Sequence, residues 1–482
     1  MKINIPTLLT CAVITASSIS YAQLTLNDAI ILALSHDPGI EKKCADVHEA
    51  AGFANEVRAD LRPQLSLDGH VGVANRDRGS IGGDTDFSRR ISITGRQHLW
   101  DGGFNKYRWE DAKQRLEAQE RLLKAQREAT AIGATEAFLD VIRARKQIEF
   151  AKQSVDAHEK VFGLAKKRAE AAGNQADIEL SESRYSLART LLLERQLALK
   201  QAEAAFVRWV GYKPTSKLIM PRTPDISALS DIDPRQNFHY LAALKQHEAA
   251  TLEKKAFEKR YGPKFFLEGT AGLGQEVLGT RGQDNDASLL IVGSWEIFDG
   301  GRRKGQVAQA AANIERQVAI MSETLVLLNQ DISARWEDYR SIRKRLDILR
   351  GYSGSLDKTV KLYHEQFDLG SRPLLSLLDI QNELIAASIR ITDTERDRTF
   401  LGYRLIFFGG RLITDTVGAK YIDVKCGQKP SNVSKNPVKL DVSKNPVSYI
   451  ADPQEKVLKL PALALTRNML DFDAGPCRAP EE

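Results

Sequence analysis

The chain repeats itself at a nearly constant spacing, and this duplication constrains its fold more than any other feature. Landmarks recur 197–200 residues apart: His48-Glu49-Ala50-Ala51 with His247-Glu248-Ala249-Ala250, Pro63 with Pro263, Trp100-Asp101-Gly102-Gly103 with Phe298-Asp299-Gly300-Gly301, Gly173 with Gly370, and Gly211 with Gly409. Since chance matches would not keep one order and one period, the pattern indicates a duplicated architecture. It predicts two structural repeats, 23–213 and 233–417, joined by a linker at 214–232.

Within each repeat the hydrophobic period changes along the chain. A period of two predicts half-buried strands, and a period near 3.5 predicts long helices that pack like coiled coils. The predicted elements are hairpins at 64–100 and 264–298, long helices at 104–172 and 302–369, and return helices at 174–211 and 374–408.

Short turns separate these elements. Asp101 and Asp299 are expected to cap the long helices, and the glycines that follow them permit a sharp turn: Gly102, Gly103, Gly300 and Gly301. At the far ends of the long helices, Gly173 and Gly370 are expected to make the turns into the return helices.

The helix lengths predict an elongated arrangement. The long helices of 69 and 68 residues would each extend ~100 Å at 1.5 Å per residue. Each return helix together with a lead-in segment (24–61 or 235–261) adds up to a similar length. Two long helices therefore match two rows of shorter helices stacked end to end.

Four strands cannot close a barrel. An open sheet edge is not tolerated in lipid, so a membrane-bound sheet of this kind has to close with other copies. Three chains would provide 12 strands and 12 helical rows, and self-association is therefore expected.

The two ends of the chain differ from the repeats. Met1–Ala22 is typical of a secretory signal peptide, with Lys2, an apolar run at Leu8–Ile19 and a small-residue cleavage site at Ser20-Tyr21-Ala22. The Pro-rich segment 418–482 is expected to be a disordered periplasmic tail. In an oxidising compartment Cys426 and Cys477 can pair and leave Cys44 free.

Composition excludes several function classes. Lys and Arg number 69 against 63 Asp and Glu, and this near balance argues against a dedicated nucleic-acid binder. After Ala22 there is no run of about 18 apolar residues, which argues against membrane-spanning helices. The His48-Glu49 and His247-Glu248 pairs lack the second histidine of a zinc-protease motif. We therefore expect no enzyme, no metal and no cofactor.

The ordered motifs resemble those of the TolC family of outer-membrane channel-tunnel proteins over about 23–417. The resemblance is carried by Leu24-Thr25-Leu26-Asn27-Asp28-Ala29 with Asp37-Pro38, Leu61-Arg62-Pro63-Gln64-Leu65, both Asp-Gly-Gly turns, and the block from Gln366-Phe367 through Gly370-Ser371-Arg372-Pro373 to Asp379. The segment 134–188 and this last block are most similar to the type I secretion branch.

This resemblance implies a mainly α-helical fold with a β-barrel part. The expected assembly is a homotrimer, with a 12-stranded barrel in outer-membrane lipid and a helical tunnel across the periplasm. It would be the exit duct for a large protein cargo, an adhesin or a repeat toxin, and would dock a membrane fusion protein and an inner-membrane ABC transporter. Multidrug efflux with another pump is one alternative, and a periplasmic coiled-coil adaptor without a pore is a second.

The resemblance also implies an entrance latch at the periplasmic tip. Arg372 and Asp379 match the latch arginine and one pore aspartate of the family, and Glu179 matches an acidic latch partner. Ser376 stands where a second aspartate is common, and Phe367 where a latch tyrosine can lie. An Arg372–Glu179 pair is therefore expected to favour the closed entrance.

Overall fold

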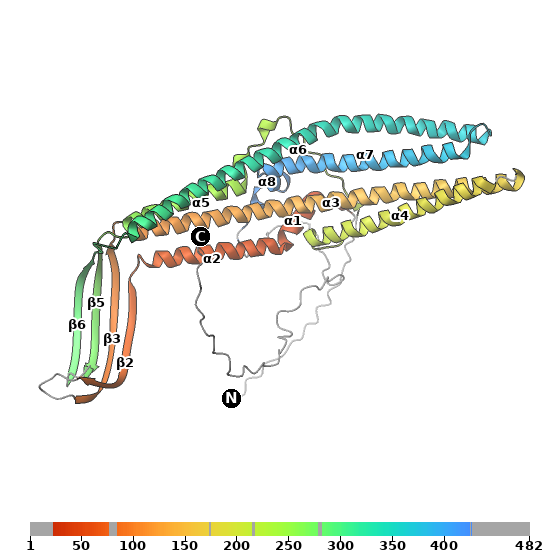
Figure 1. Ribbon diagram of the computed structural model, residues 1–482. Coiled ribbons are helices and arrows are strands. Elements are labelled where there is room, and N and C mark those ends of the chain that lie inside the picture. Colours follow the sequence, from red (N-terminus) through yellow and green to blue (C-terminus); the bar gives the residue numbers. More distant parts are fainter. Residues whose placement is uncertain are drawn as a thin grey trace, which may run out of the picture. The chain divides into compact units, whose positions relative to one another are not determined.

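A computed structural model of the protein describes residues 23–76, 84–172, 175–214, 217–277, 282–424 and 426. The predicted signal peptide, Gly173 and Cys477 lie outside the described residues. Helices make up most of this part of the chain (Figure 1). The helices are α1 (Leu26–His36), α2 (Pro38–Ala59), α3 (Phe104–Ala172), α4 (Gln175–Val210), α5 (Phe238–Lys259), α6 (Arg302–Asp368), α7 (Leu374–Phe408) and α8 (Leu412–Thr416).

The strands form two sheets. β1 (Gln23–Leu24) pairs in parallel with β4 (Lys217–Leu218). The larger sheet is antiparallel, with the order β2-β3-β5-β6, and its strands are β2 (Gln64–Arg76), β3 (Asp84–Trp100), β5 (Lys264–Gln275) and β6 (Gln283–Ser294). Short 3-10 turns lie at Leu229–Asp231, Pro234–Gln236 and Ala419–Tyr421.

The lead-in segment of the first repeat is two helices rather than one continuous helix. Thr25 caps α1 through a capping box with Asp28, and α1 ends at His36. Asp37 then accepts a hydrogen bond from the Gly39 N–H at 3.1 Å, and Pro38 begins α2. Proline suits the first position of a helix because it needs no hydrogen-bond donor there.

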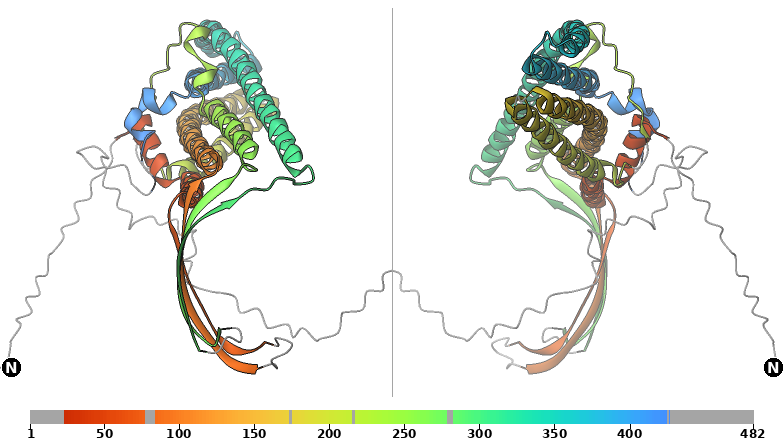
Figure 2. Two further views of the ribbon diagram at one scale, coloured as in Figure 1. Left: turned by 90° about the vertical axis from the view of Figure 1, so that its left-hand side faces the viewer. Right: turned by 90° about the vertical axis from the view of Figure 1, so that its right-hand side faces the viewer.

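The four-stranded sheet has one apolar face. Its register pairs odd-numbered residues with odd-numbered residues, for example Leu67 with Ile93 and Leu267 with Ile291. Odd positions carry large apolar side chains that remain exposed, such as Leu65 at 76% and Leu289 at 71%. The opposite face carries polar residues, including Arg90, whose guanidinium pairs with Asp284 and Asp286. Figure 2 shows that the sheet curves along its strands.

The strands connect to helices at one end of the sheet. α2 leads into β2, α3 follows β3, α5 leads into β5 and α6 follows β6. Next to the sheet, α3 packs between α2 and α5, and α5 packs against α6. Farther from the sheet, α3 and α4 form one antiparallel hairpin and α6 and α7 form another, and α3 packs against α7. Among the described residues, no helix combines the length and apolar content required for a membrane span.

The largest apolar core lies midway along α3. It joins α1, α3, α4, α7 and the segment after α7, with Ile30, Phe138, Phe206 and Leu412 almost fully buried. Alanines at 131, 134 and 137 of α3 are also buried there. Small side chains such as these let neighbouring helices approach α3 closely.

The ordered chain continues beyond the predicted start of the tail. We call residues 412–424 and Cys426 the C-terminal strap, which packs Leu412, Ile413, Tyr421 and Ile422 into the large core. The prediction that residues from 418 onward are disordered is therefore wrong for 418–424. Buried apolar side chains within that stretch hold it against the helices.

Two buried charges of α3 bind the C-terminal strap. The Glu128 carboxylate accepts hydrogen bonds from the N–H groups of Leu412 and Ile413, both at 3.0 Å, at the start of α8. The Arg127 guanidinium donates to the carbonyls of Ile422 and Val424. These contacts satisfy backbone groups that burial would otherwise leave unpaired.

The cysteine pairing differs from the expected one. Cys44 of α2 forms a disulfide with Cys426 of the C-terminal strap, with a Cα–Cα distance of 5.5 Å. Cys44 is therefore not free, and Cys426 is not available to Cys477. The strap brings Cys426 to α2, a proximity that the 382-residue separation along the chain conceals.

Candidate functional site

The two Asp-Gly-Gly turns between sheet and helix have the same geometry. The Asp101 carboxylate accepts hydrogen bonds from the N–H groups of Gly103 and Asn105, both at 2.9 Å. Asp299 accepts from Gly301 at 2.9 Å and from Arg303 at 2.7 Å. Each aspartate thus satisfies donors in the first turn of its long helix, as predicted.

The glycines of these turns have a backbone that other residues rarely adopt. Gly102 and Gly300 have φ of 69° and 65°, and Gly103 and Gly301 have φ of 94° and 93°. The N–H groups, first that of Arg303, lower the pKa of Asp299. This carboxylate therefore stays ionised as a cap at neutral pH.

The tip turn of the second repeat closes at Gly370. Gly370 has φ of 75°, its N–H donates to the Phe367 carbonyl at 3.0 Å, and the Ser371 N–H donates to the Gln366 carbonyl at 2.9 Å. This pattern ends α6 and turns the chain into α7.

A small apolar cluster holds the two tips together. Phe367 of α6 is 3% exposed and packs in one cluster with Val161 and Ala165 of α3 and Leu377 and Leu378 of α7. Phe367 is therefore part of the packing at the tip.

Arg372 does not pair with Glu179 within one chain. Its guanidinium donates to the Gln366 side-chain oxygen at 3.0 and 2.8 Å and lies 3.9 Å from the centroid of the Tyr363 ring. Glu179 is exposed and accepts from Gln175 at 3.4 Å. Within one chain, Gln366 and Tyr363 hold the arginine on its own hairpin, and the Arg372–Glu179 pair stays a prediction for the assembled protein.

The tip contains a different link between the hairpins. Asp379 of α7 pairs with Arg184 of α4 at 3.3 Å, with 56% and 32% of their side chains exposed. Ser376 lies one turn earlier on α7 and is half-buried. Sequence reasoning missed Arg184, since nothing in the α4 pattern shows which residue of α7 it faces.

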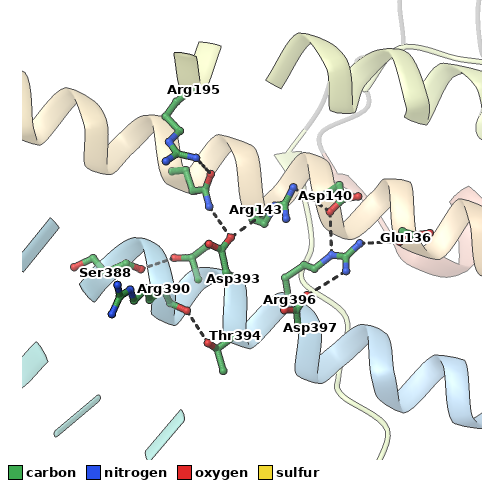
Figure 3. A network of polar contacts seen from close by, with 12 residues as sticks. Glu136, Asp140, Arg143, Arg195, Ser388, Arg390, Asp393, Thr394, Arg396 and Asp397 are labelled. Carbon is green, nitrogen blue, oxygen red and sulfur yellow. Dashed lines mark hydrogen bonds and ion pairs between the residues drawn. The ribbon is translucent and has the colours of Figure 1, made fainter. Parts of the chain in front are cut away.

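A second link between the hairpins lies closer to the large core, and we call it the polar belt (Figure 3). The Arg396 side chain, only 12% exposed, donates to Asp140 at 2.9 Å, Glu136 at 3.2 Å and Asp397 at 3.2 Å. The polar belt consists of Glu136, Asp140, Arg143, Lys146 and Gln147 of α3, Arg195 of α4, Arg350 of α6, and Asp393, Glu395, Arg396 and Asp397 of α7.

All four helices contribute to the polar belt. The Gln147 amide donates to Asp393 at 2.6 Å and accepts from Arg195 of α4 at 3.2 Å. Glu395 accepts from Lys146 of α3 at 3.2 Å and from Arg350 of α6 at 2.9 Å. The polar belt therefore joins both hairpins at one level.

The electrostatics of the polar belt follow from its partial burial. Burial is the largest influence on the pKa of Arg396 and lowers it, but Asp140, Glu136 and Asp397 outweigh burial and raise the pKa overall. Burial raises the pKa of Glu395, but Arg350 and Lys146 together outweigh burial, so the pKa is lowered overall. Burial raises the pKa of Asp393. The α3 side of the polar belt can be found in the sequence, because polar residues follow one another there at intervals of three or four. They are Glu136, Asp140, Arg143 and Gln147.

Metal-ligand geometry is absent from the part of the chain that the structure describes. No group of three or more His, Cys, Asp or Glu side chains is arranged there to hold a metal ion.

Comparisons with known proteins give one consistent result. A model of the outer membrane efflux protein family matches residues 29–212 and 235–400. The outer membrane efflux protein BepC of Brucella suis biovar 1 (strain 1330) is 24% identical over 415 residues, covering 83% of this chain and 88% of BepC. Protein CyaE of Bordetella pertussis is 19% identical over 381 residues, covering 76% of this chain and 80% of CyaE.

Solved structures show the same fold. The Campylobacter jejuni CmeC outer membrane channel superimposes with a TM-score of 0.71 at 14% identity, covering 90% of this chain and 96% of CmeC. Because the chain matches the outer membrane efflux protein family, the interpretation as a periplasmic adaptor without a pore is wrong. Because the family model covers most of both repeats, this chain belongs to the outer membrane efflux protein family, has a TolC-like channel fold, and lies in the outer membrane and extends into the periplasm.

Proposed function

We propose that the protein is the outer-membrane exit duct of a tripartite system for type I secretion of a large protein. The observation that carries this proposal is a four-stranded sheet with an apolar exposed face, continuous with two long helical hairpins. The duct is passive, and the chain contributes walls and an entrance rather than a catalytic centre.

The open edges of the protomer support assembly into a homotrimer. β2 and β6 lie at the two edges of the sheet, and each has one side without a partner strand within the described chain. Three copies that pair β6 of one chain with β2 of the next would close a barrel of 12 strands and leave no edge in lipid.

Exposed apolar side chains on two helices support the same assembly. Leu193 and Leu197 of α4 are 65% and 60% exposed, and Val326 and Ile348 of α6 are 65% and 72% exposed. The helices pack in the order α4, α3, α7, α6, so α4 and α6 lie on opposite sides of the α3–α7 pair (Figure 1). Contacts between α4 and α6 of neighbouring chains would bury these side chains.

Aromatic side chains mark the membrane boundary at the helix end of the sheet. Trp100 and Phe265 contact each other at 6.0 Å between ring centroids, and each is at least 41% exposed. Trp295 follows β6 and is 60% exposed. Such rings are typical of the interfacial girdles of outer-membrane barrels.

The periplasmic tip is the proposed entrance. In a trimer, Asp379 would contribute three carboxylates around one axis, which favours cations. Glu179 is exposed at this tip, and a contact between chains would bring it to Arg372 in place of the arginine's contact with Gln366. A membrane fusion protein and an inner-membrane ABC transporter would supply cargo there.

The type I secretion assignment is supported by the sequence of 134–188 and of the Gln366–Asp379 block, which resemble that branch. Multidrug efflux is the second candidate, favoured by the likeness to BepC, which is an outer membrane efflux protein.

Two measurements test the proposed function. The purified protein in planar bilayers should give discrete cation-preferring channels, and Asp379→Ala should weaken block by divalent cations. Loss of secreted protein from the culture supernatant after gene deletion, with unchanged drug sensitivity, would support secretion. The opposite pattern would support efflux, and a protein that forms no channels would contradict both.

A further inference from the structure

A cavity of about 620 Å³ lies where the helices meet the four-stranded sheet, and we call it the junction pocket. Its volume is within the range of sites that bind small molecules. Helices α2, α3 and α5 and the first residue of β5 line it. Three of these side chains are phenylalanines, which give the pocket apolar walls: Phe53, Phe104 and Phe257.

Cationic side chains outnumber carboxylates in the junction pocket. Arg115 pairs with both carboxylates that line it, at 2.8 Å from Asp111 and 3.2 Å from Glu253. Arg108 pairs with Asp60 at the end of α2, at 3.0 Å. The other two cations of the pocket are Arg260 and Lys264.

Arg260 and Lys264 carry charge that no carboxylate neutralises directly. Among the described residues, neither side chain is paired with an aspartate or a glutamate. The Lys264 Nζ lies 5.2 Å from the centroid of the Phe104 ring, and the Arg108 guanidinium lies 5.4 Å from the same centroid. Positive charge is therefore held beside an aromatic wall. An anion with an apolar body would match both features.

The junction pocket lies on the side of the helices that continues the polar face of the sheet. Lys264 is an even-numbered residue of β5, like Glu268, and even-numbered residues form the polar face. On α3, Lys124 binds the C-terminal strap and follows Arg115 by nine residues, about two and a half helical turns. The strap and the pocket therefore lie on opposite sides of α3.

We propose that the junction pocket is a luminal binding site for amphipathic anions, molecules that join an aromatic body to a sulfonate or carboxylate group. The phenylalanines contact the aromatic body, and Arg260 and Lys264 bind the anionic group. The luminal position rests on the proposed function, because a closed barrel turns its polar face to the lumen. Binding itself needs no channel, since one chain contributes the whole pocket.

Isothermal titration calorimetry of the purified full-length protein with naphthalenesulfonate tests the site. The sulfonate should bind once per chain. Naphthylmethylammonium has a similar aromatic body and the opposite charge, and it should not bind. Titrations into detergent solution without protein measure how much of each probe enters the micelles. Absence of sulfonate binding, or equal binding of the two probes, would overturn the proposal.

Substitutions locate the bound sulfonate. Arg260→Gln with Lys264→Gln should weaken its binding by about tenfold or more, because charge-assisted hydrogen bonds are lost. Phe104→Leu keeps both cations and should weaken binding by about two- to tenfold through the lost ring contact. The matched control is Arg340→Gln with Lys361→Gln, which removes two exposed cations of α6 and should leave the affinity unchanged.

The two pocket variants report on different parts of the site, so a folding defect in one does not remove the test. Circular dichroism compares the folding of every variant with that of the unsubstituted protein. Unchanged affinity in a folded variant of either kind would overturn the proposal.

Reversal potentials in a KCl gradient separate the position of the site from its binding. Arg260→Gln with Lys264→Gln removes two positive charges per chain from the lumen, so the preference for K⁺ over Cl⁻ should rise. An unchanged reversal potential would overturn the luminal position. A protein that binds the sulfonate but forms no channels would contradict the proposed function and support the binding site.

Discussion

The two hairpins meet in the middle and at the tip, and the two meeting places are built differently. In the middle, dehydrated charges lie beside the largest core, and all four helices contribute to one network. At the tip, a six-residue apolar cluster and one exposed ion pair join helices that end in a glycine turn at Gly370. The hairpins are therefore held by more contacts, and by more deeply buried ones, in the middle than at the tip.

The largest expected effect comes from removing the central cation of the polar belt. Arg396→Ala leaves Asp140, Glu136 and Asp397 close together without their partner, so the free energy of unfolding should fall by about 1.5–3 kcal/mol. Denaturant unfolding of the detergent-solubilised protein, followed by circular dichroism, measures this. Arg340→Ala removes an exposed α6 pair with Glu337 and is the control, with an expected loss below about 1 kcal/mol. Similar losses in both variants would show that Arg396 stabilises the protein no more than an exposed ion pair does.

A comparable, pH-dependent effect is expected where the C-terminal strap seals the core. Burial raises the pKa of Glu128 from 4.5 to about 7, although hydrogen bonds from Ile413 and Leu412 act in the opposite direction. The folded state then holds this proton more tightly than the unfolded state. Its stabilising contribution is present below about pH 4.5 and is lost as the pH rises to about 7.

Glu128→Gln tests this contribution because the amide does not titrate. From pH 4.5 to pH 7, the unsubstituted protein should lose on the order of 3 kcal/mol more unfolding free energy than the variant does. Unfolding titrations of both proteins at several pH values measure that difference. A difference that stays constant with pH would show that Glu128 ionises normally in the fold.

The smallest effect on stability is expected at the tip. Arg184→Gln removes the exposed ion pair with Asp379, and the unfolding free energy should change by less than about 1 kcal/mol. Channel conductance should nevertheless rise, because this pair joins the α3–α4 and α6–α7 hairpins at the proposed entrance. Denaturant unfolding and planar-bilayer recordings are made on the same preparations of the variant and the unsubstituted protein. The first measures stability and the second measures conductance. A large loss of stability would show that the tip pair stabilises the fold as strongly as the polar belt does.

Local pattern predicted the elements closely. The hydrophobic period indicated helices at 104–172 and 374–408, and α3 and α7 occupy those residues. Alternation indicated strands, and the odd-numbered apolar side chains do share one face of the sheet. The Asp101 and Asp299 caps could be predicted from residue type, because a short carboxylate can accept hydrogen bonds from the free N–H groups at a helix start.

Partners between distant segments escaped prediction. The stripe of polar residues on α3 is visible in the sequence, but its match with Asp393 and Arg396 depends on how α7 is rotated and shifted against α3. The hydrogen bonds from Arg372 to Gln366 also escaped prediction, because the sequence does not show which side chain of its own hairpin the arginine contacts.

What the sequence by itself determined is therefore the duplication, the helices and strands, their apolar faces and the family, because each depends on residue type and local period. The tertiary structure alone decided the Cys44–Cys426 disulfide, the buried C-terminal strap and the polar belt. These depend on which helix faces meet, and a helical period of 3.6 residues identifies the face of a helix but not the face it packs against.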